Sequence, residues 1–124
     1  MIGYVTLGTN NFDAAVRFYD ELLRTIGAAR TYEGESFVAW PTGPKSPAVA
    51  VTKPFDQQAT TVGNGVMVAL VAATPAKVNE LHAKAIELGA NDEGAPGPRS
   101  GNFYAGYFRD PDGNKLNAFC MVQD

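Results

Sequence analysis

Chemically reactive side chains are few in this 124-residue sequence, which has one histidine and one cysteine. His82 follows Leu81 in an apolar stripe of helical spacing, where a surface or helix-packing role is the simpler interpretation than a metal-ligand role. Cys120 stands between Phe119 and Met121, with no histidine or basic neighbour that could activate its thiol. We therefore expect a buried, inert cysteine rather than a nucleophile.

Asn117 is the polar residue whose position is most informative. The Asp-Pro-Asp-Gly sequence shortly before it is typical of a turn, and the apolar, aromatic runs on both sides predict a hairpin. Asn117 is the only polar side chain between Leu116 and Cys120 in the second strand of this hairpin. Asp110 and Asp112 belong to the turn, where hydrogen bonds to their own backbone explain them.

Arg99 is the candidate cation for binding an anionic group. It follows the stiff Pro-Gly-Pro segment at residues 96–98, which can hold a guanidinium at the rim of a cavity, where it would bind an anion through two hydrogen bonds. A solvated arginine in a loop is the simpler alternative, and both interpretations stay open.

The first half of the chain predicts the order β-α-β-β-β. Residues 2–8 alternate as a strand does, and residues 9–11 offer side chains that can cap a helix. Apolar residues then recur every three or four positions from Phe12 to Ile26, and Gly27 can end the helix. Three short strands are expected at about residues 28–32, 36–40 and 48–53.

The second half repeats this order after a polar connector at about residues 54–64. An apolar strand at 65–72 precedes a helix from Thr74 to Gly89. A stiff, glycine-rich loop follows at 94–101, in which a short strand is an open alternative, and the hairpin strands are 103–109 and 116–121. Subtracting residue numbers pairs Tyr4 with Met67 and Phe18 with Leu81, at an offset of 63 in both cases. An internal duplication explains this, with modules at about 1–55 and 65–124 of one domain.

Composition excludes several kinds of partner. The net charge is −3 with mixed acidic and basic residues, so no basic surface for nucleic acid or a lipid headgroup is expected. No apolar stretch approaches the roughly 20 residues that span a membrane. A single cysteine forms no internal disulfide, and the first residues lack a signal-peptide pattern, so we expect a cytoplasmic protein.

The sequence resembles the vicinal oxygen chelate superfamily, the group of glyoxalases, bleomycin-resistance proteins and extradiol dioxygenases. The resemblance rests on residues 11–19 after the first strand, residues 63–65 at the start of the second half, and the Arg-Asp-Pro-Asp-Gly-Asn turn at 109–114. It implies an α+β fold in which two paired βαβββ modules form a curved mixed sheet around a cavity. It also implies a small-molecule ligand and a homodimer.

Metal-binding members of that superfamily use four inward side chains, typically histidine or glutamine and glutamate. By the resemblance these positions fall here on Tyr4, Ala50, Met67 and Asn117. None of them is a good ligand for zinc, iron, nickel or manganese, which prefer imidazole or carboxylate. We therefore expect neither a metal nor another cofactor.

The resemblance also implies which side chains line the cavity. The expected lining is Tyr4, Trp40, Met67, Arg99, Tyr104, Tyr107 and Asn117. A phenol and an amide can hold a ligand's oxygens or a water, or they can fill the former metal site as a neutral, hydrogen-bonded pair. The aromatic side chains can stack on a planar ligand, or they can belong to the core.

Three functions are compatible with these residues. The first is a glyoxalase-like protein that has lost its metal ligands and binds a planar or apolar small molecule. The alternative is an enzyme, a lyase or isomerase of the lactoylglutathione lyase type, either metal-independent through Tyr4 and Asn117 or with an atypical metal site. The third is a structural or regulatory dimer without a ligand.

Overall fold

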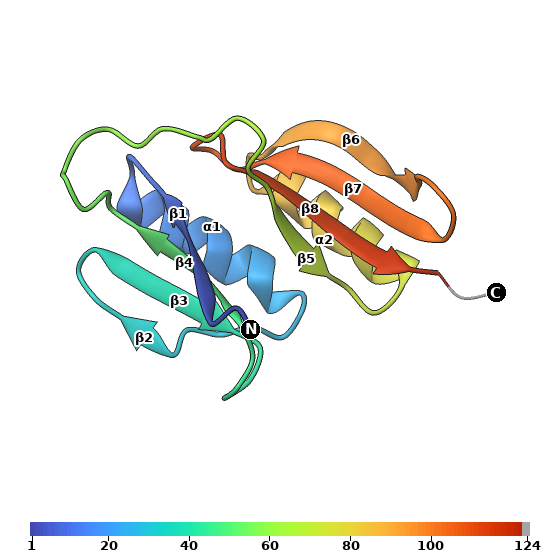
Figure 1. Ribbon diagram of the computed structural model, residues 1–124, viewed down its shortest axis with the longest axis horizontal. Helices are drawn as coiled ribbons and strands as arrows, with labels where there is room; N and C mark the ends of the chain where they lie inside the picture. Colours follow the sequence, from blue (N-terminus) through green and yellow to red (C-terminus); the bar gives the residue numbers. More distant parts are fainter. Residues whose placement is uncertain (123–124) are drawn as a thin grey trace. The chain divides into compact units, whose positions relative to one another are not determined.

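The computed structural model describes residues 1–122, in which the chain forms two helices and eight strands (Figure 1). In chain order the elements are β1 (Tyr4–Gly8), α1 (Phe12–Arg24), β2 (Tyr32–Glu33), β3 (Phe37–Pro41), β4 (Ala48–Thr52), β5 (Val68–Val71), α2 (Pro75–Glu87), β6 (Asn91–Pro98), β7 (Phe103–Arg109) and β8 (Lys115–Met121). None of the helices among these residues is long and apolar enough to cross a bilayer.

The chain divides into two compact units, Met1–Val62 and a second unit that begins at Gly63. The first unit contains a sheet of order β1-β4-β3-β2, and the second a sheet of order β5-β8-β7-β6. In each sheet the first two strands are parallel and the other pairs are antiparallel. This repeated βαβββ order confirms the predicted α+β fold, and Phe12 and Pro75, which begin α1 and α2, are 63 residues apart as predicted.

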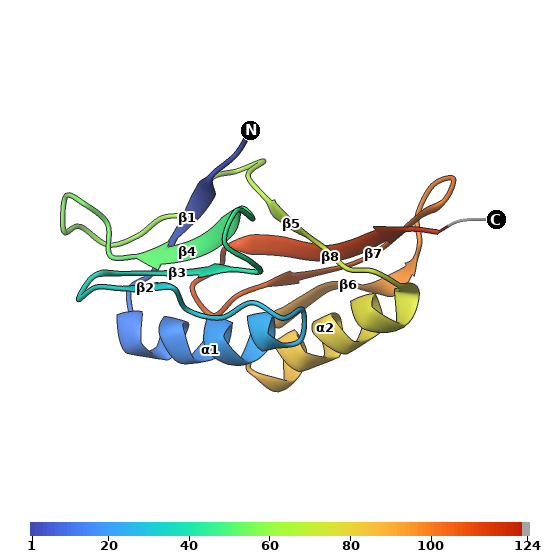
Figure 2. The ribbon, with the colours of Figure 1, turned by 90° about the horizontal axis from the view of Figure 1, so that it is seen from below.

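Each helix packs on one face of the sheet in its own unit (Figure 2). Asn11 caps α1, because its side chain accepts a hydrogen bond from the Ala14 amide at 3.2 Å. The helix ends at Arg24, two residues before the predicted end, where the Thr25 hydroxyl donates to the Leu22 carbonyl at 2.7 Å. Thr74 caps α2 in the same way, through the Lys77 amide at 3.1 Å.

Side chains of each strand alternate between the helix and the opposite face, which we call the open face. In the first sheet, buried Val38, Trp40 and Val51 face α1. Their sequence neighbours therefore project from the open face. This alternation decides which residues can reach a ligand on the open face of either sheet.

Two predicted segments differ from the structure. The strand expected at 28–32 is reduced to Tyr32–Glu33, since the Ala29 and Thr31 amides bond to β3 carbonyls at 3.3 Å without a regular ladder. The loop expected at 94–101 is mostly strand β6, which pairs with β7 through register shifts around Gly94. The short strand left open within this loop is thus present and begins earlier, at Asn91, and the glycine and proline residues, which usually mark loops, hid its length in the sequence.

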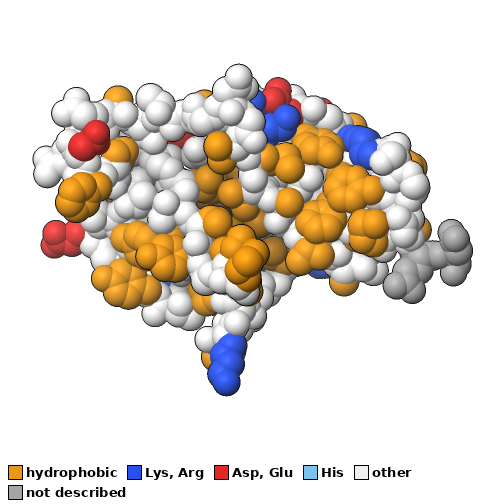
Figure 3. All heavy atoms as spheres, in the orientation of Figure 1, with side chains coloured by type: hydrophobic (Ala, Val, Ile, Leu, Met, Phe, Trp, Pro, Cys, Tyr) orange, Lys and Arg blue, Asp and Glu red, His pale blue; other side chains and the backbone are white. Residues whose placement is uncertain are grey.

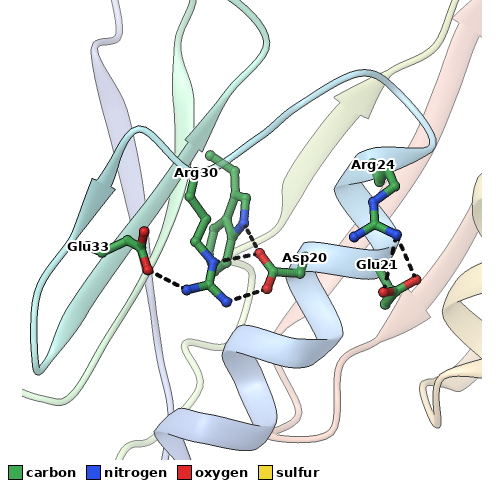
Figure 4. A network of polar contacts seen from close by, with 6 residues as sticks. Asp20, Glu21, Arg24, Arg30 and Glu33 are labelled. Carbon is green, nitrogen blue, oxygen red and sulfur yellow. Dashed lines mark hydrogen bonds and ion pairs between the residues drawn. The ribbon is translucent and has the colours of Figure 1, made fainter.

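Trp40 was expected to line a cavity, and the structure corrects this. Its side chain is 2% exposed and packs against Tyr19 of α1. Its indole Nε1 donates to Asp20 Oδ1 at 2.8 Å, and the same carboxylate receives the Arg30 guanidinium (Figure 4). Arg30 also bonds to Glu33 at 2.5 Å, so this network joins α1 to β2 and β3.

Asp20 provides a test of this network through pH. Hydrogen bonds from Arg30 lower the pKa of the Asp20 carboxyl, and the Trp40 indole acts in the same direction against the opposing effect of burial. A lowered folded-state pKa gives stability that is present above the unfolded pKa and lost as pH falls through the folded pKa. We expect Asp20→Asn to cost about 1–2 kcal/mol of unfolding free energy at pH 7, and less as pH falls below about 4. Urea unfolding from pH 7 to pH 3 measures this. A pH-independent difference would contradict it.

Candidate functional site

The first unit carries two of the residues that the resemblance aligned with metal-ligand positions. Tyr4 lies opposite Ala48, and Ala50 lies opposite Thr6 and Ala39, so Tyr4 and Ala50 project from the same open face in neighbouring strands. Tyr4 is 60% exposed, whereas Ala50 is fully buried. Only Tyr4 offers a polar group and a ring to a ligand there.

Tyr4 belongs to a pocket of about 480 Å³ on this face. Its ring lies edge-on to Phe37, with centroids 5.8 Å apart, and Tyr32 contacts the other side of Phe37 at 5.6 Å. Tyr32 is 59% exposed. We call this site the aromatic pocket; its lining is Gly3, Tyr4, Tyr32, Phe37, Ala39, Pro41, Pro44, Ser46 and Ala48. Hydrophobic side chains gather over β2 and β3 on this side of the unit (Figure 3).

A second pocket in the same unit has a volume of about 690 Å³ and was missed in the sequence. We call it the polar pocket; its lining is Thr9, Asn10, Phe12, Ser36, Thr52, Lys53, Pro54, Phe55, Gln57, Gln58 and Ala59. The segment after β4 was interpreted only as a connector. Its polar composition was a usable signal, because amide side chains without periodicity can serve binding as well as linkage.

The second unit carries the other two aligned positions, Met67 and Asn117. Asn117 lies in the centre of its sheet, opposite Tyr107 of β7 and Ala69 of β5, so these three side chains share the open face. Asn117 is 1% exposed, and its Oδ1 has no hydrogen-bond partner among the described residues. Met67 comes one residue before β5 and is 39% exposed.

Tyr107 is flanked by two cations. The Arg99 guanidinium carbon lies 5.4 Å from the centre of its ring, and Lys115 Nζ lies 5.7 Å from it. Arg99 also donates to the backbone carbonyls of Ala95 at 2.7 Å and Gly97 at 3.1 Å. Arg99 is therefore held on β6 and Tyr107, and both of its terminal guanidinium nitrogens donate to backbone carbonyls.

Tyr104 was expected beside Tyr107 in a cavity lining, and the structure corrects this too. Its neighbours in β7 alternate, so it projects toward α2, where its hydroxyl donates to Asn79 Oδ1 at 2.7 Å. His82 packs on the same side against Phe108, with ring centroids 6.2 Å apart, which confirms its helix-packing role.

Two further local predictions are confirmed in the second unit. Cys120 is buried. The Asp110 carboxylate accepts hydrogen bonds from the Asp112 amide at 3.0 Å and the Asn114 amide at 2.9 Å, as expected for the turn. Within β6, the Gly94 amide donates to Asp92 Oδ1 at 2.9 Å and lowers the pKa of that carboxyl.

The residues at the four aligned positions do not fit a divalent metal. Ala50 has no donor atom, Met67 offers only a thioether, and Asn117 offers one amide oxygen. Among residues 1–122, no three or more histidine, cysteine, aspartate or glutamate side chains come together as a metal site would require.

Comparison with known proteins identifies the family. A family model described as a glyoxalase-like domain matches residues 4–122. The chain belongs to the glyoxalase-like domain family. A glyoxalase/bleomycin resistance protein from Albidiferax ferrireducens T118 is 32% identical, with 96% of this chain and 97% of that chain covered and a TM-score of 0.88. No curated protein matches the sequence.

More distant solved structures share the fold of this glyoxalase-like chain. One is a glyoxalase/bleomycin resistance protein/dioxygenase family enzyme from Burkholderia phytofirmans PsJN, with 19% identity, 97% and 98% of the two chains covered, and a TM-score of 0.77. Another is a glyoxalase-related enzyme from Fulvimarina pelagi, with 20% identity, 96% and 86% covered, and a TM-score of 0.77. At these identities the likeness concerns the fold alone.

The unpartnered oxygen of Asn117 yields a stability prediction. Asn117→Leu keeps a similar volume and removes a buried acceptor that has no donor, so we expect the unfolding free energy to rise by about 1 kcal/mol. Asn114→Leu is the matched control, because Asn114 Nδ2 donates to Asp110 Oδ2 at 3.0 Å and its loss should destabilise. Urea unfolding of both variants measures this. Destabilisation by Asn117→Leu comparable to that of Asn114→Leu would contradict it.

The four residues at the aligned metal-ligand positions are unsuitable for a divalent metal, and this yields a second prediction. The purified, untagged protein should contain far less than one equivalent of metal, and added zinc or nickel should not raise its Tm, because binding to the native state would stabilise it. Elemental analysis and thermal unfolding measure this. About one iron, manganese, nickel or zinc per chain would overturn it.

Proposed function

We propose that this glyoxalase-like chain binds a small planar or apolar molecule and does so without the divalent metal of its superfamily. The aromatic pocket is the single observation that carries this proposal. A homodimer and a cytoplasmic location are part of the same proposal. In the second unit, taken by itself, we propose Met67, Arg99, Tyr107 and Asn117 as ligand contacts.

Three features of the aromatic pocket support a planar ligand. Its volume of about 480 Å³ is within the usual range for small-molecule sites, about 300–1,000 Å³. Tyr4 and Tyr32 leave more than half of their surface exposed, although aromatic rings gain most from burial. Phe37 between them offers a ring whose edge-on contacts on both sides hold it in place.

The chemistry of the pocket favours binding over turnover. Its polar groups are hydroxyls of Tyr4, Tyr32 and Ser46, and no carboxylate or imidazole among its lining can act as a general base near neutral pH. The rings supply contact area and orientation. Sequestration of a ligand needs no more than this.

A neutral planar probe tests the proposal. 2-Naphthol should shift the backbone amide NMR signals of β1 and β3 in the full-length protein. Tyr4→Ala should weaken binding about three- to tenfold, because a stacking ring is lost. Val71→Ala is the control, since Val71 is 67% exposed in the second sheet.

Two results would contradict the proposal. The first is no binding of 2-naphthol at millimolar concentration. The second is turnover of methylglyoxal with glutathione that is abolished by EDTA, which would indicate the metal-dependent lyase.

A further inference from the structure

One cross-strand pair links the lining of the aromatic pocket to the lining of the polar pocket in the first sheet. Phe37 lines the aromatic pocket, Thr52 lines the polar pocket, and these two residues are directly paired across β3 and β4. Directly paired residues have side chains on the same face and about 5 Å apart. A molecule seated on Phe37 can therefore extend into the polar pocket.

Among the described residues that line the polar pocket, Lys53 alone has an ionisable side chain. Its backbone amide bonds to the Ser36 carbonyl at 2.9 Å, and its Nζ lies 5.6 Å from the centre of the Phe12 ring. It takes part in none of the ion pairs of the described residues. Its charge thus lies over the Phe12 ring, and no carboxylate of residues 1–122 pairs with it.

Hydrogen bonds hold the loop after β4, which lines the polar pocket, in a specific conformation. The Thr60 amide donates to Asn10 Oδ1 at 2.7 Å, which fastens the end of the loop to the segment after β1. Gln57 has a φ of 62°, an uncommon value for a residue other than glycine. The Asp56 carboxylate accepts from the Gln58 amide at 3.0 Å, so this nearby acid is engaged within the loop.

We propose that the polar pocket receives an anionic group of the ligand, so that this protein selects planar organic anions, such as aromatic carboxylates, over neutral planar molecules. Lys53 supplies the charge, and the side-chain amides of Gln57 and Gln58 supply hydrogen-bond donors. The ring of the ligand lies on Phe37 and Tyr4. This inference rests on the proposed function and adds to it the chemical class of the ligand.

A matched pair of probes tests the inference in the full-length protein. 2-Naphthoate and 2-naphthol share a ring system and differ in charge near neutral pH. Calorimetric titration should give about fivefold tighter binding of 2-naphthoate, as expected for one partly exposed ion pair. Lys53→Met should abolish this preference and leave 2-naphthol binding unchanged, whereas Lys53→Arg should keep it.

Lys45→Met is the matched control. Lys45 lies between Pro44 and Ser46, which line the aromatic pocket, so this variant removes the same charge from a position outside the polar pocket. The preference for 2-naphthoate should persist in it. Transfer of the effect to Lys45→Met, equal affinity for the two probes, or no binding of 2-naphthoate would each overturn the inference. Binding of neither probe would contradict the proposed function itself, whereas equal binding of both would contradict only the preference for anions.

Discussion

The packing of one helix on one face of each sheet is the constraint on which the possible ligand contacts depend. Because strand side chains alternate, each helix takes every second residue of β3, β7 and β8 for the core. Trp40 and Tyr104 lie on that side and bond to Asp20 and Asn79 of the helices. The strand residues that alternate with these helix-facing positions project from the open faces. There the chemistry of their side chains decides which ligands can bind.

The fold could be predicted from the sequence because the sequence signals for it are local and repeated. Capping residues, helical stripes and the offset of 63 residues placed α1 and α2. The face of the sheet from which Trp40 and Tyr104 project could not be predicted from the sequence. Large apolar residues occur on both faces of β3 and β7, as Phe37 and Tyr107 illustrate, so alternation alone cannot say which set faces the helix.

The polar pocket illustrates a different limit. Its lining comes from strand ends, from the first residue of α1 and from a loop, and no periodicity joins such segments. The bond between Thr60 and Asn10 connects positions 50 residues apart in the chain. The aromatic pocket has the same origin, since Tyr4, Tyr32 and Phe37 meet only when β1, β4, β3 and β2 pair in that order.

Some polar side chains have hydrogen-bond or ion-pair partners within the fold and others do not. This difference indicates which of them can bind a ligand specifically. The Asp20 carboxylate has donors from Trp40 and Arg30, so its cost of burial is offset within the fold. Within residues 1–122, the buried Asn117 Oδ1 has no donor, and Lys53 forms no ion pair with a carboxylate. An unpaired buried acceptor costs stability, whereas a partly solvated cation costs little and remains available to an anion. Lys53 is for this reason the stronger candidate for choosing a ligand by its charge.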